Sequence, residues 1–261
     1  MYKIETLITT INLENIDTLL NNMNIKGNFI VGNQCSENKI EKKDNGIIVS
    51  TDMRGVGQNR NSIIERSTAD ICVLADDDMV FCDDYELIVD KVFSDNHDAD
   101  VVIFNFIEES QGRRVNRKRK RITMRNYMNY GAARFAFRRN SINYNAITFN
   151  RMFGGGTPHQ CGEDSLFLND CIRSGLKVVA VPEALASLTE ARESTWFKGY
   201  DDKYFFDKGV FLGIAHPVVG RLLGMLLILK HREYRENKSF YECYKCVTKG
   251  IKFAKAKEKQ K

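Results

Sequence analysis

The sequence predicts an α/β protein with a mixed, mainly parallel sheet flanked by helices, followed by a helical C-terminal extension. Through the first 106 residues, apolar runs alternate with amphipathic stretches in the order β-α-β-β-α-β-α-β, which is typical of layered α/β domains. The run ICVLA at residues 71–75 is continuously apolar, as a strand covered on both faces should be. The 261 residues are 43% hydrophobic and 28% charged, which allows a substantial core and argues against disorder.

The elements of the first half follow from their apolar patterns. Short apolar runs predict strands over residues 2–9, 28–31, 46–50, 71–75 and 100–106. A helix is predicted over residues 13–23, where apolar residues recur at helical spacing. Two more are predicted over residues 57–66, after a glycine turn, and over residues 83–93, before the last of these strands. Ligands of such sheets bind outside the carboxyl ends of the strands, so functional side chains should follow Thr9, Val31 and Ala75.

The second half is less regular. The basic segment 113–125 interrupts the pattern and is expected to form a mobile hairpin or loop. The sequence then predicts an aromatic-rich strand, a helix and a final strand that Pro182 ends, over residues 133–137, 163–174 and 177–181. These elements complete a predicted domain of residues 1–205.

Residues 206–261 form the predicted C-terminal extension. Of the 20 residues from Val210 to Leu229, 14 are apolar, a length sufficient for a spanning helix, although Pro217 and Arg221 weaken that interpretation. A helix buried in the protein and a helix docked at a membrane interface are the alternatives left open. The Lys-rich tail suits an anionic cytoplasmic leaflet.

The net charge of +5 conceals an acidic body with two basic parts. Residues 230–261 contain 11 Lys and Arg against 4 Asp and Glu, and segment 113–125 contains 8 basic residues and no acid. A nucleic-acid binder would spread basic charge over its folded face, so no nucleic-acid partner is expected. The odd number of cysteines, seven, and the lack of an apolar signal region predict a cytoplasmic protein. The apolar and basic C-terminal stretch predicts a peripheral position on the inner face of the cytoplasmic membrane.

Three consecutive acids, Asp76-Asp77-Asp78, directly follow the apolar run ICVLA. Their mutual repulsion calls for a cation, and Mg²⁺ is commonly held by one or two carboxylates together with substrate phosphates. The triplet therefore predicts a metal–diphosphate site. The alternative is a solvated turn that caps the next helix, since Asp83 and Asp84 continue the acidic run.

Two further segments carry candidate chemistry. RGVGQNRN at residues 54–61 opens a helix, where glycines let the backbone approach a ligand and Arg60 can reach a phosphate or a nucleobase. Gly162-Glu163-Asp164 starts another helix after the glycine run 154–156, and one of its carboxylates is a candidate general base. An ordinary loop and a simple acidic helix start are the respective alternatives.

In their order and spacing, these segments resemble the family-2 glycosyltransferases of the GT-A (Rossmann-like) fold over roughly residues 1–200. The resemblance rests on Thr9-Thr10-Ile11-Asn12, RGVGQNRN, ICVLADDD and GEDSLFL, while ESTWFKGY at 193–200 resembles bacterial members that build capsule or lipopolysaccharide sugars. It implies inverting transfer of a sugar from a nucleotide-diphosphate-sugar, with UDP favoured, to a saccharide or polyprenyl-linked acceptor. A nucleotidyltransferase and a basic nucleic-acid-binding protein are the alternatives.

The resemblance also implies roles for individual residues. Asp78, with Asp76, would hold Mg²⁺ or Mn²⁺, Asp164 would deprotonate the acceptor hydroxyl, and Glu163 would orient the acceptor. The residues expected to bind the nucleotide-sugar are Thr9, Thr10, Asn12, Asn33, Arg60, Asp76 and Asp77. Those expected on the acceptor side are Gly155, Gly156 and Trp196.

The sequence departs from the family pattern after its second strand. The family often has Asp-Asp-Gly-Ser there, whereas this chain has Gly32-Asn33-Gln34-Cys35. The acid that would contact uracil is thus replaced by Asn33, whose amide can bond a base without selecting uracil. A histidine metal ligand after the last strand is also absent, and Glu190 and Glu193 stand in that region.

Overall fold

The computed structural model describes residues 1–107, 114–160, 162–189, 199–236 and 238–258. The chain divides into two compact units. The first contains Met1–Met152 and Glu163–Ala191, and the second contains Phe153–Gly162 and Arg192–Lys261. The second unit therefore includes a stretch, 153–162, that the sequence alone places in the N-terminal domain.

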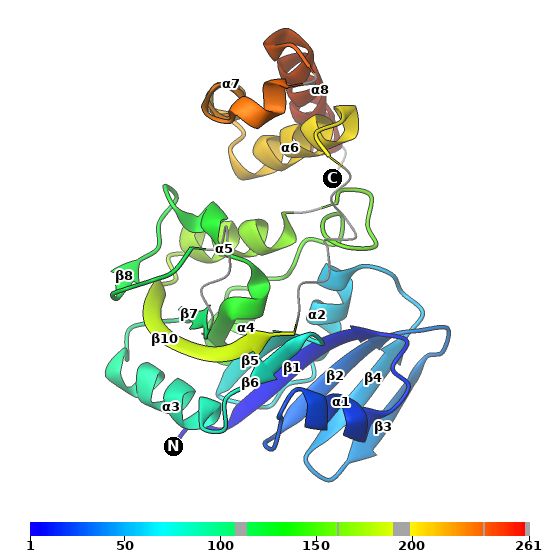
Figure 1. Ribbon diagram of the computed structural model, residues 1–261, viewed down its shortest axis with the longest axis vertical. Coiled ribbons are helices and arrows are strands. Elements are labelled where there is room, and N and C mark those ends of the chain that lie inside the picture. The colour runs from blue at the N-terminus through cyan, green and yellow to red at the C-terminus, as the bar shows by residue number, and fades with distance from the viewer. Residues whose placement is uncertain (108–113, 161, 190–198, 237, 259–261) are drawn as a thin grey trace. The chain divides into compact units, whose positions relative to one another are not determined.

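Within its described residues, the first unit is built on one ten-stranded sheet with the order β3-β4-β2-β1-β5-β9-β7-β10-β6, and β8 pairs with β10 (Figure 1). The strands are β1 (Ile4–Ile11), β2 (Phe29–Gln34), β3 (Lys39–Lys43), β4 (Gly46–Thr51), β5 (Ile71–Asp76), β6 (Met79–Phe81), β7 (Val101–Phe106), β8 (Lys120–Arg121), β9 (Phe135–Arg138) and β10 (Val178–Leu188). The run β4-β2-β1-β5 is parallel throughout, which confirms the predicted α/β class. In this register Thr9 lies opposite Asp76 and Thr10 lies opposite Asn33.

Helices cover both faces of the sheet. The first unit contains α1 (Ile16–Asn22), α2 (Val56–Ile64), α3 (Tyr85–Asp95), α4 (Arg139–Tyr144) and α5 (Glu163–Arg173). On one face, α1 and α3 bury Ile16, Val89 and Phe93 in a core shared with the sheet. On the other face, Phe167 of α5 stacks on Phe149 with 4.3 Å between ring centroids, and it also contacts aromatic residues of β9.

Four strands differ from the expectation, since the short strands β6 and β8 are also not among the predicted ones. The sequence does not predict β3, because all five of its residues are exposed and no apolar alternation marks it. The expected stop at Pro182 is wrong, since β10 continues to Leu188. The pairing of β10 with β7 shifts register between Ala180 and Ala186, and such an irregularity accommodates a proline that lacks an N–H donor.

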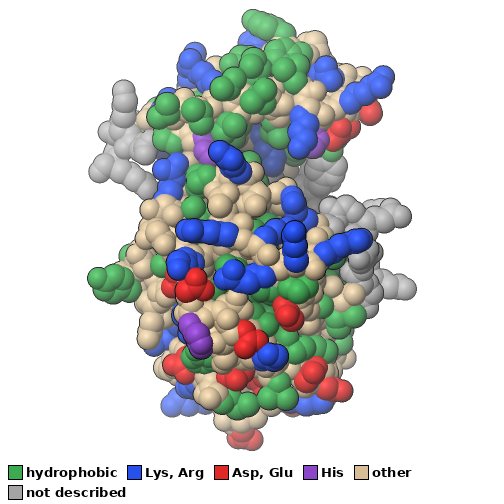
Figure 2. Space-filling view, turned by 90° about the vertical axis from the view of Figure 1, so that its left-hand side faces the viewer, with side chains coloured by type: hydrophobic (Ala, Val, Ile, Leu, Met, Phe, Trp, Pro, Cys, Tyr) green, Lys and Arg blue, Asp and Glu red, His purple; other side chains and the backbone are tan. Residues whose placement is uncertain are grey.

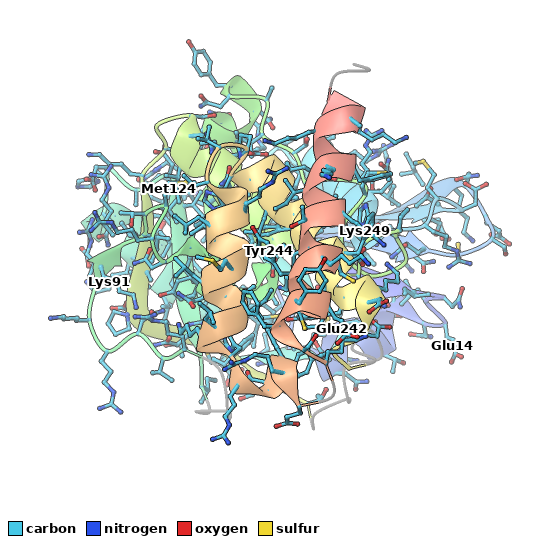
Figure 3. All side chains as sticks on the ribbon, turned by 90° about the horizontal axis from the view of Figure 1, so that it is seen from above. Glu14, Lys91, Met124, Glu242, Tyr244 and Lys249 are labelled. Atoms are coloured by element: carbon cyan, nitrogen blue, oxygen red, sulfur yellow. The ribbon has the colours of Figure 1, made fainter. Side chains whose placement is uncertain are left out.

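The second unit contains α6 (Asp202–Ala215), α7 (Gly220–Lys230) and α8 (Phe240–Glu258). A Cβ atom on Gly250 would collide with the carbonyl oxygen of Phe206, and one on Gly209 would collide with that of Val247, so α6 and α8 pack backbone to backbone. Figure 3 shows α7 beside α8. The apolar stretch 210–229 is divided between α6 and α7, and none of the helices in the described part of the chain has the length and apolar composition needed to cross a bilayer.

A buried polar cluster ties the stretch 153–162 to α6 within this unit. Asp207 accepts hydrogen bonds from His159 Nδ1 (2.8 Å), Lys203 Nζ (2.6 Å) and the backbone N–H of Gln160 (3.2 Å). Burial acts to raise the pKa of Asp207, but these three partners outweigh it and the pKa is lowered. His159 also packs against the ring of Phe153.

Candidate active site

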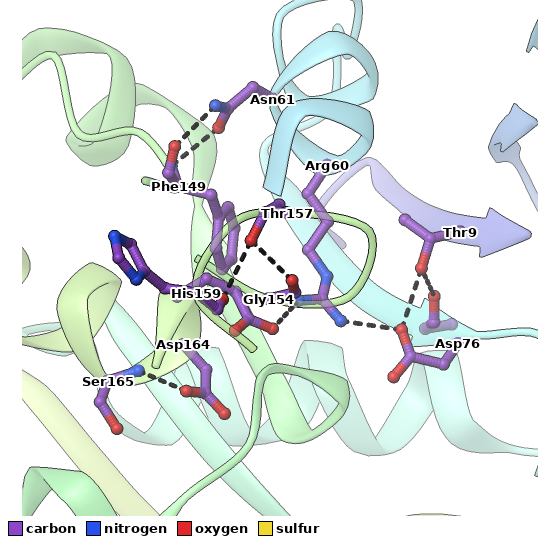
Figure 4. A network of polar contacts seen from close by, with 12 residues as sticks. Thr9, Arg60, Asn61, Asp76, Phe149, Gly154, Thr157, His159, Asp164 and Ser165 are labelled. Atoms are coloured by element: carbon purple, nitrogen blue, oxygen red, sulfur yellow. Dashed lines mark hydrogen bonds and ion pairs between the residues drawn. The ribbon is translucent and has the colours of Figure 1, made fainter. Parts of the chain in front are cut away.

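The carboxyl ends of β1 and β5 bring two threonines to the acidic triplet. Thr9 Oγ1 donates to Asp76 Oδ1 at 2.9 Å, and Thr10 Oγ1 donates to Asp77 Oδ2 at 2.7 Å. These contacts follow from the parallel pairing of β1 with β5, which sets both strand ends at one edge of the sheet. Figure 4 shows the contact of Thr9 with Asp76. Two predicted donor-binding segments are therefore neighbours in the structure.

Arg60 of α2 joins the acidic triplet to the start of α5. Its guanidinium is buried and bonds Asp76 Oδ1 at 2.8 Å and Glu163 Oε1 at 3.3 Å. It also lies over the ring of Phe149, 5.3 Å from the centroid. Burial acts to lower the pKa of Arg60, but the carboxylates of Asp76 and Glu163 raise it overall, so this side chain stays charged. One cation thus holds carboxylates from two distant parts of the sequence.

A cavity of about 320 Å³ opens beside this ion pair. It is bordered by Arg60 and by four carboxylates, those of Asp76, Asp78, Glu163 and Asp164. The remainder of its wall comes from Phe106, Arg114, Asn129, Gly131, Ala132, Ala133, Arg134 and Leu188. The structure therefore brings the predicted metal ligands and the predicted general base into one cavity, although about 90 residues separate them in sequence.

The turn that carries Asp78 is tied to the end of β10. The backbone carbonyl of Asp78 accepts from the backbone N–H and the hydroxyl of Thr189, at 2.9 and 3.0 Å. At the start of α5, Asp164 Oδ1 accepts from the backbone N–H of Ser165 at 2.6 Å. Gly131 lies next to Asp164, since a Cβ atom there would be 3.6 Å from its Oδ2.

The donor set of the cavity fits a divalent cation that shares its coordination with a substrate. Among the described residues, no three His, Cys, Asp or Glu side chains lie close enough together to hold a metal on their own. Two carboxylates, Asp76 and Asp78, do border the cavity, and Mg²⁺ is commonly bound by one or two carboxylates plus substrate phosphates. Asp76 Oδ1 is bonded to Thr9 and Arg60, so both Asp76 and Asp78 stay candidate ligands, as the sequence predicts. Glu190 and Glu193 lie outside the described residues.

Asn12 and Asn33 border a different cavity, of about 440 Å³, next to α1, β3 and β4. The buried amide of Asn33 is engaged within the protein: Oδ1 accepts from Leu13 N at 2.9 Å and Nδ2 donates to Ser50 Oγ at 3.2 Å. The structure does not bring these two residues into the carboxylate cavity. Their contact with the nucleotide stays a prediction.

The residues expected on the acceptor side lie partly in the second unit and partly outside the described residues. Gly155 and Gly156 belong to the second unit, where Gly156 has a positive φ of 78°. Trp196 lies outside the described residues. Their role therefore also stays a prediction.

Sequence reasoning missed two residues that build the site. Arg134 is buried in the cavity wall and donates to the carbonyl of Phe104 (2.6 Å) and to Asn105 Oδ1 (2.9 Å). Asn61 exchanges two 2.8 Å hydrogen bonds with the backbone of Phe149 and so fixes the ring beneath Arg60. A lone arginine in the apolar run AARFAF was the signal available for Arg134, whereas no local signal marks Asn61.

Comparison with solved structures finds similar folds at low sequence identity. S. aureus TarS 1–349 in complex with UDP-GlcNAc has a TM-score of 0.58 and 15% identity, over 95% of this chain and 71% of that chain. The same protein in complex with UDP has a TM-score of 0.59 and 14% identity, over 99% and 92%. The mannosyltransferase PcManGT from Pyrobaculum calidifontis, in complex with GDP-Man and Mn²⁺, has a TM-score of 0.53 and 12% identity, over 98% and 75%.

A family model identifies the family of this chain. A search among curated proteins found no match. The family model described as glycosyl transferase family 2 matches residues 33–167, a stretch that contains Arg60, the acidic triplet and Glu163-Asp164. Since this match spans just over half of the chain and the sheet has the GT-A architecture, the protein belongs to glycosyl transferase family 2 and is a glycosyltransferase.

Proposed function

We propose that this glycosyltransferase moves a sugar, with inversion, from a nucleotide-diphosphate-sugar to a saccharide or polyprenyl-linked acceptor in the synthesis of bacterial surface polysaccharide. The observation that carries the proposal is the single cavity bordered by Asp76, Asp78, Glu163 and Asp164. TarS is described with UDP-GlcNAc and UDP, and PcManGT with GDP-Man, so donors of this chemical class support it. We favour a UDP-sugar as the donor.

Asp164 is the proposed general base. It accepts the proton of the acceptor hydroxyl while that oxygen bonds the anomeric carbon and the bond from this carbon to the diphosphate breaks. Attack from the face opposite the diphosphate inverts the configuration at that carbon. Glu163 is bonded to Arg60, which favours an orienting role for Glu163 and leaves the proton transfer to its neighbour.

Asp78 and Asp76 are the proposed holders of Mg²⁺ or Mn²⁺. A bound divalent cation supplies electrostatic stabilisation of the charge that develops on the leaving diphosphate. Thr9 and Arg60 fix the orientation of Asp76 through the same carboxylate oxygen. Thr10 fixes Asp77, which we assign to the ribose of the donor.

Asp78→Asn tests this assignment. It should abolish the rise in melting temperature that UDP with Mn²⁺ gives to the wild type, and calorimetry should find no metal-dependent UDP binding. Asp83→Asn is a matched control, because Asp83 is an exposed acid of the same region that pairs with Lys26. Unchanged UDP binding by Asp78→Asn contradicts the metal assignment, and release of pyrophosphate instead of UDP from a donor sugar would favour nucleotidyl transfer.

The second unit offers a surface suited to peripheral membrane association. From Leu222 to Leu229, α7 contains only glycine and apolar residues, and its Gly224 and Ile228 are buried. Its outer side exposes Leu222, Leu226 and Leu229, each about half accessible to solvent. A helix that is apolar all round requires cover on every side, yet the described residues cover α7 on one side only.

We assign that cover to an anionic lipid surface. Arg221 and Lys230 stand at the ends of the apolar face, and Arg232 and Arg235 follow in the next turn. Apolar side chains rimmed by Lys and Arg are characteristic of helices that lie in the membrane interface. Such docking would present a polyprenyl-linked acceptor to the enzyme at the bilayer surface.

A further inference from the structure

The basic segment, residues 114–125 as the structure describes them, is a concentration of positive charge that the donor site leaves unexplained. It contains seven cations and no acid: Arg114, Arg117, Lys118, Arg119, Lys120, Arg121 and Arg125. All of these except Lys120 are exposed. Figure 2 shows Lys and Arg side chains gathered across the middle of this face of the molecule.

The backbone of the segment is held in place by buried polar contacts. Asn116, which is 2% exposed, exchanges two backbone hydrogen bonds with the side chain of Asn105 (3.0 and 2.9 Å) and accepts one from Tyr130 (3.0 Å). Arg134 donates to the carbonyl of Arg114 at 2.9 Å, and β8 pairs with β10. The chain therefore presents its cations from a fixed frame, which lowers the ordering cost of binding an anion.

Few of these charges are neutralised by the protein. Arg119 lies 3.6 Å from Asp98, and Lys120 lies over the ring of Tyr130. Within the described part of the chain, no carboxylate is within ion-pair distance of Arg117, Lys118 or Arg121. Cations so close together repel one another, and an anionic ligand would offset that repulsion.

The basic segment begins at the wall of the active-site cavity. Arg114 borders the same cavity as Asp78 and Asp164. The cavity is rich in carboxylates, which would repel an anionic acceptor unless cations stood at its edge. An acceptor that offers a hydroxyl to Asp164 would have its neighbouring groups within reach of Arg114. The cations that follow lead away from the cavity to β8, which pairs with Val179 and Ala180 of β10, so an extended acceptor would run along them.

We infer that the basic segment binds the phosphate groups of a polyanionic acceptor, an assignment that rests on the proposed function. Five of the seven cations are arginines, whose planar forks suit bidentate bonding to phosphate oxygens. Their distribution over twelve residues suits several phosphates, as in a pyrophosphate or a phosphodiester chain, better than one isolated charge.

The test measures binding of inorganic tripolyphosphate by calorimetry at low salt. EDTA is included to remove metal-dependent binding at the donor cavity. The variant carries Arg117→Glu, Lys118→Glu and Arg121→Glu. The matched control carries Lys42→Glu, Arg66→Glu and Arg151→Glu, three exposed cations outside the basic segment. Wild type and control should bind alike, while the variant should bind about tenfold more weakly or worse, and added salt should weaken binding.

Several outcomes would overturn the assignment. One is equal binding of tripolyphosphate by the variant and the wild type at unchanged melting temperature. The others are no tripolyphosphate binding by the wild type, and tighter binding of a short RNA of equal charge than of tripolyphosphate. Sedimentation with phosphatidylglycerol vesicles separates the sources of phosphate. If the variant loses vesicle binding but keeps tripolyphosphate, the cations serve lipid headgroups and not the acceptor. UDP binding by the wild type with Mn²⁺ is measured separately. A failure of the proposed function can then be told apart from a failure of the phosphate-binding assignment.

Discussion

Arg60→Met isolates the electrostatic role of the cation that joins the acidic triplet to α5. The substitution removes the guanidinium and keeps an apolar side chain against Phe149. It leaves Asp76 and Glu163 without their shared partner, and both carboxylates border a cavity that already holds Asp78 and Asp164. We expect the protein to fold with a lower free energy of unfolding.

The size of the loss follows from the burial of the three groups. Removing one partner of a fully buried ion pair costs about 3–5 kcal/mol, because a charge is left uncompensated. Arg60 and Glu163 have side chains only 5% and 14% exposed, but Asp76 is 36% exposed and regains water. Loss of the contact with the Phe149 ring adds roughly 0.5–1 kcal/mol. We therefore expect a decrease of about 3 kcal/mol.

Urea unfolding followed by circular dichroism measures this difference. Arg66→Met, an exposed cation just beyond the end of α2, is the control and should change the free energy of unfolding by less than about 0.5 kcal/mol. A double-mutant cycle with Asp76→Asn should give a coupling free energy of at least about 1 kcal/mol. If Arg60→Met costs no more than the control, or if the coupling is zero, the ion pair does not hold these segments together.

Three further predictions concern the base, the membrane surface and the second unit. Asp164→Asn should lower kcat by about 10²–10⁴-fold with donor Kd unchanged, as measured by steady-state kinetics. Near-full turnover by this variant would mean that another residue is the base. The double substitution Leu222→Glu, Leu226→Glu should reduce sedimentation with anionic vesicles. Leu87→Glu, at an equally exposed leucine of α3, should not. An equal loss of sedimentation in both variants would refute docking through α7. Because the pKa of Asp207 is lowered in the folded state, its ionised form stabilises the protein above the unfolded value of about 4, and this contribution is lost as pH falls through the folded value. The stability difference between wild type and Asp207→Asn should therefore shrink below about pH 4, and a difference independent of pH would contradict this reasoning.

The sequence predicts those parts of the fold that local pattern encodes. Continuous apolar runs locate β1, β2, β4, β5 and β7 to within a few residues, and the helix expected at 163–174 is observed as Glu163–Arg173. The acidic triplet stands at a strand end in both the prediction and the structure. The edge strand β3 escapes prediction because lysine-rich edges lack a buried face and serve to discourage pairing with other chains.

The parts that depend on tertiary contacts could not be predicted. That Arg60 can reach a phosphate or a nucleobase stays a prediction. Its two carboxylate partners lie 16 and 103 positions away, and no local pattern identifies them. The bonds of Arg134 span 20 to 30 positions, and their effect is to fix the backbone of a basic stretch that looks like an unanchored loop in the sequence. Strand continuation through Pro182 likewise depends on the register of a neighbouring strand.

The stretch 153–162 has a consequence for modularity. The chain leaves the first unit after Met152, contributes Phe153 and His159 to the second unit, and returns at Glu163 before its C-terminal helices are reached. A shortened protein that ends after β10 would keep the stretch 153–162. It would lose Asp207, the partner of His159, and Phe211, which lies against Gly162. The C-terminal helices therefore cannot be removed or replaced on their own. An exchange of these helices between relatives must include the residues that directly precede Glu163.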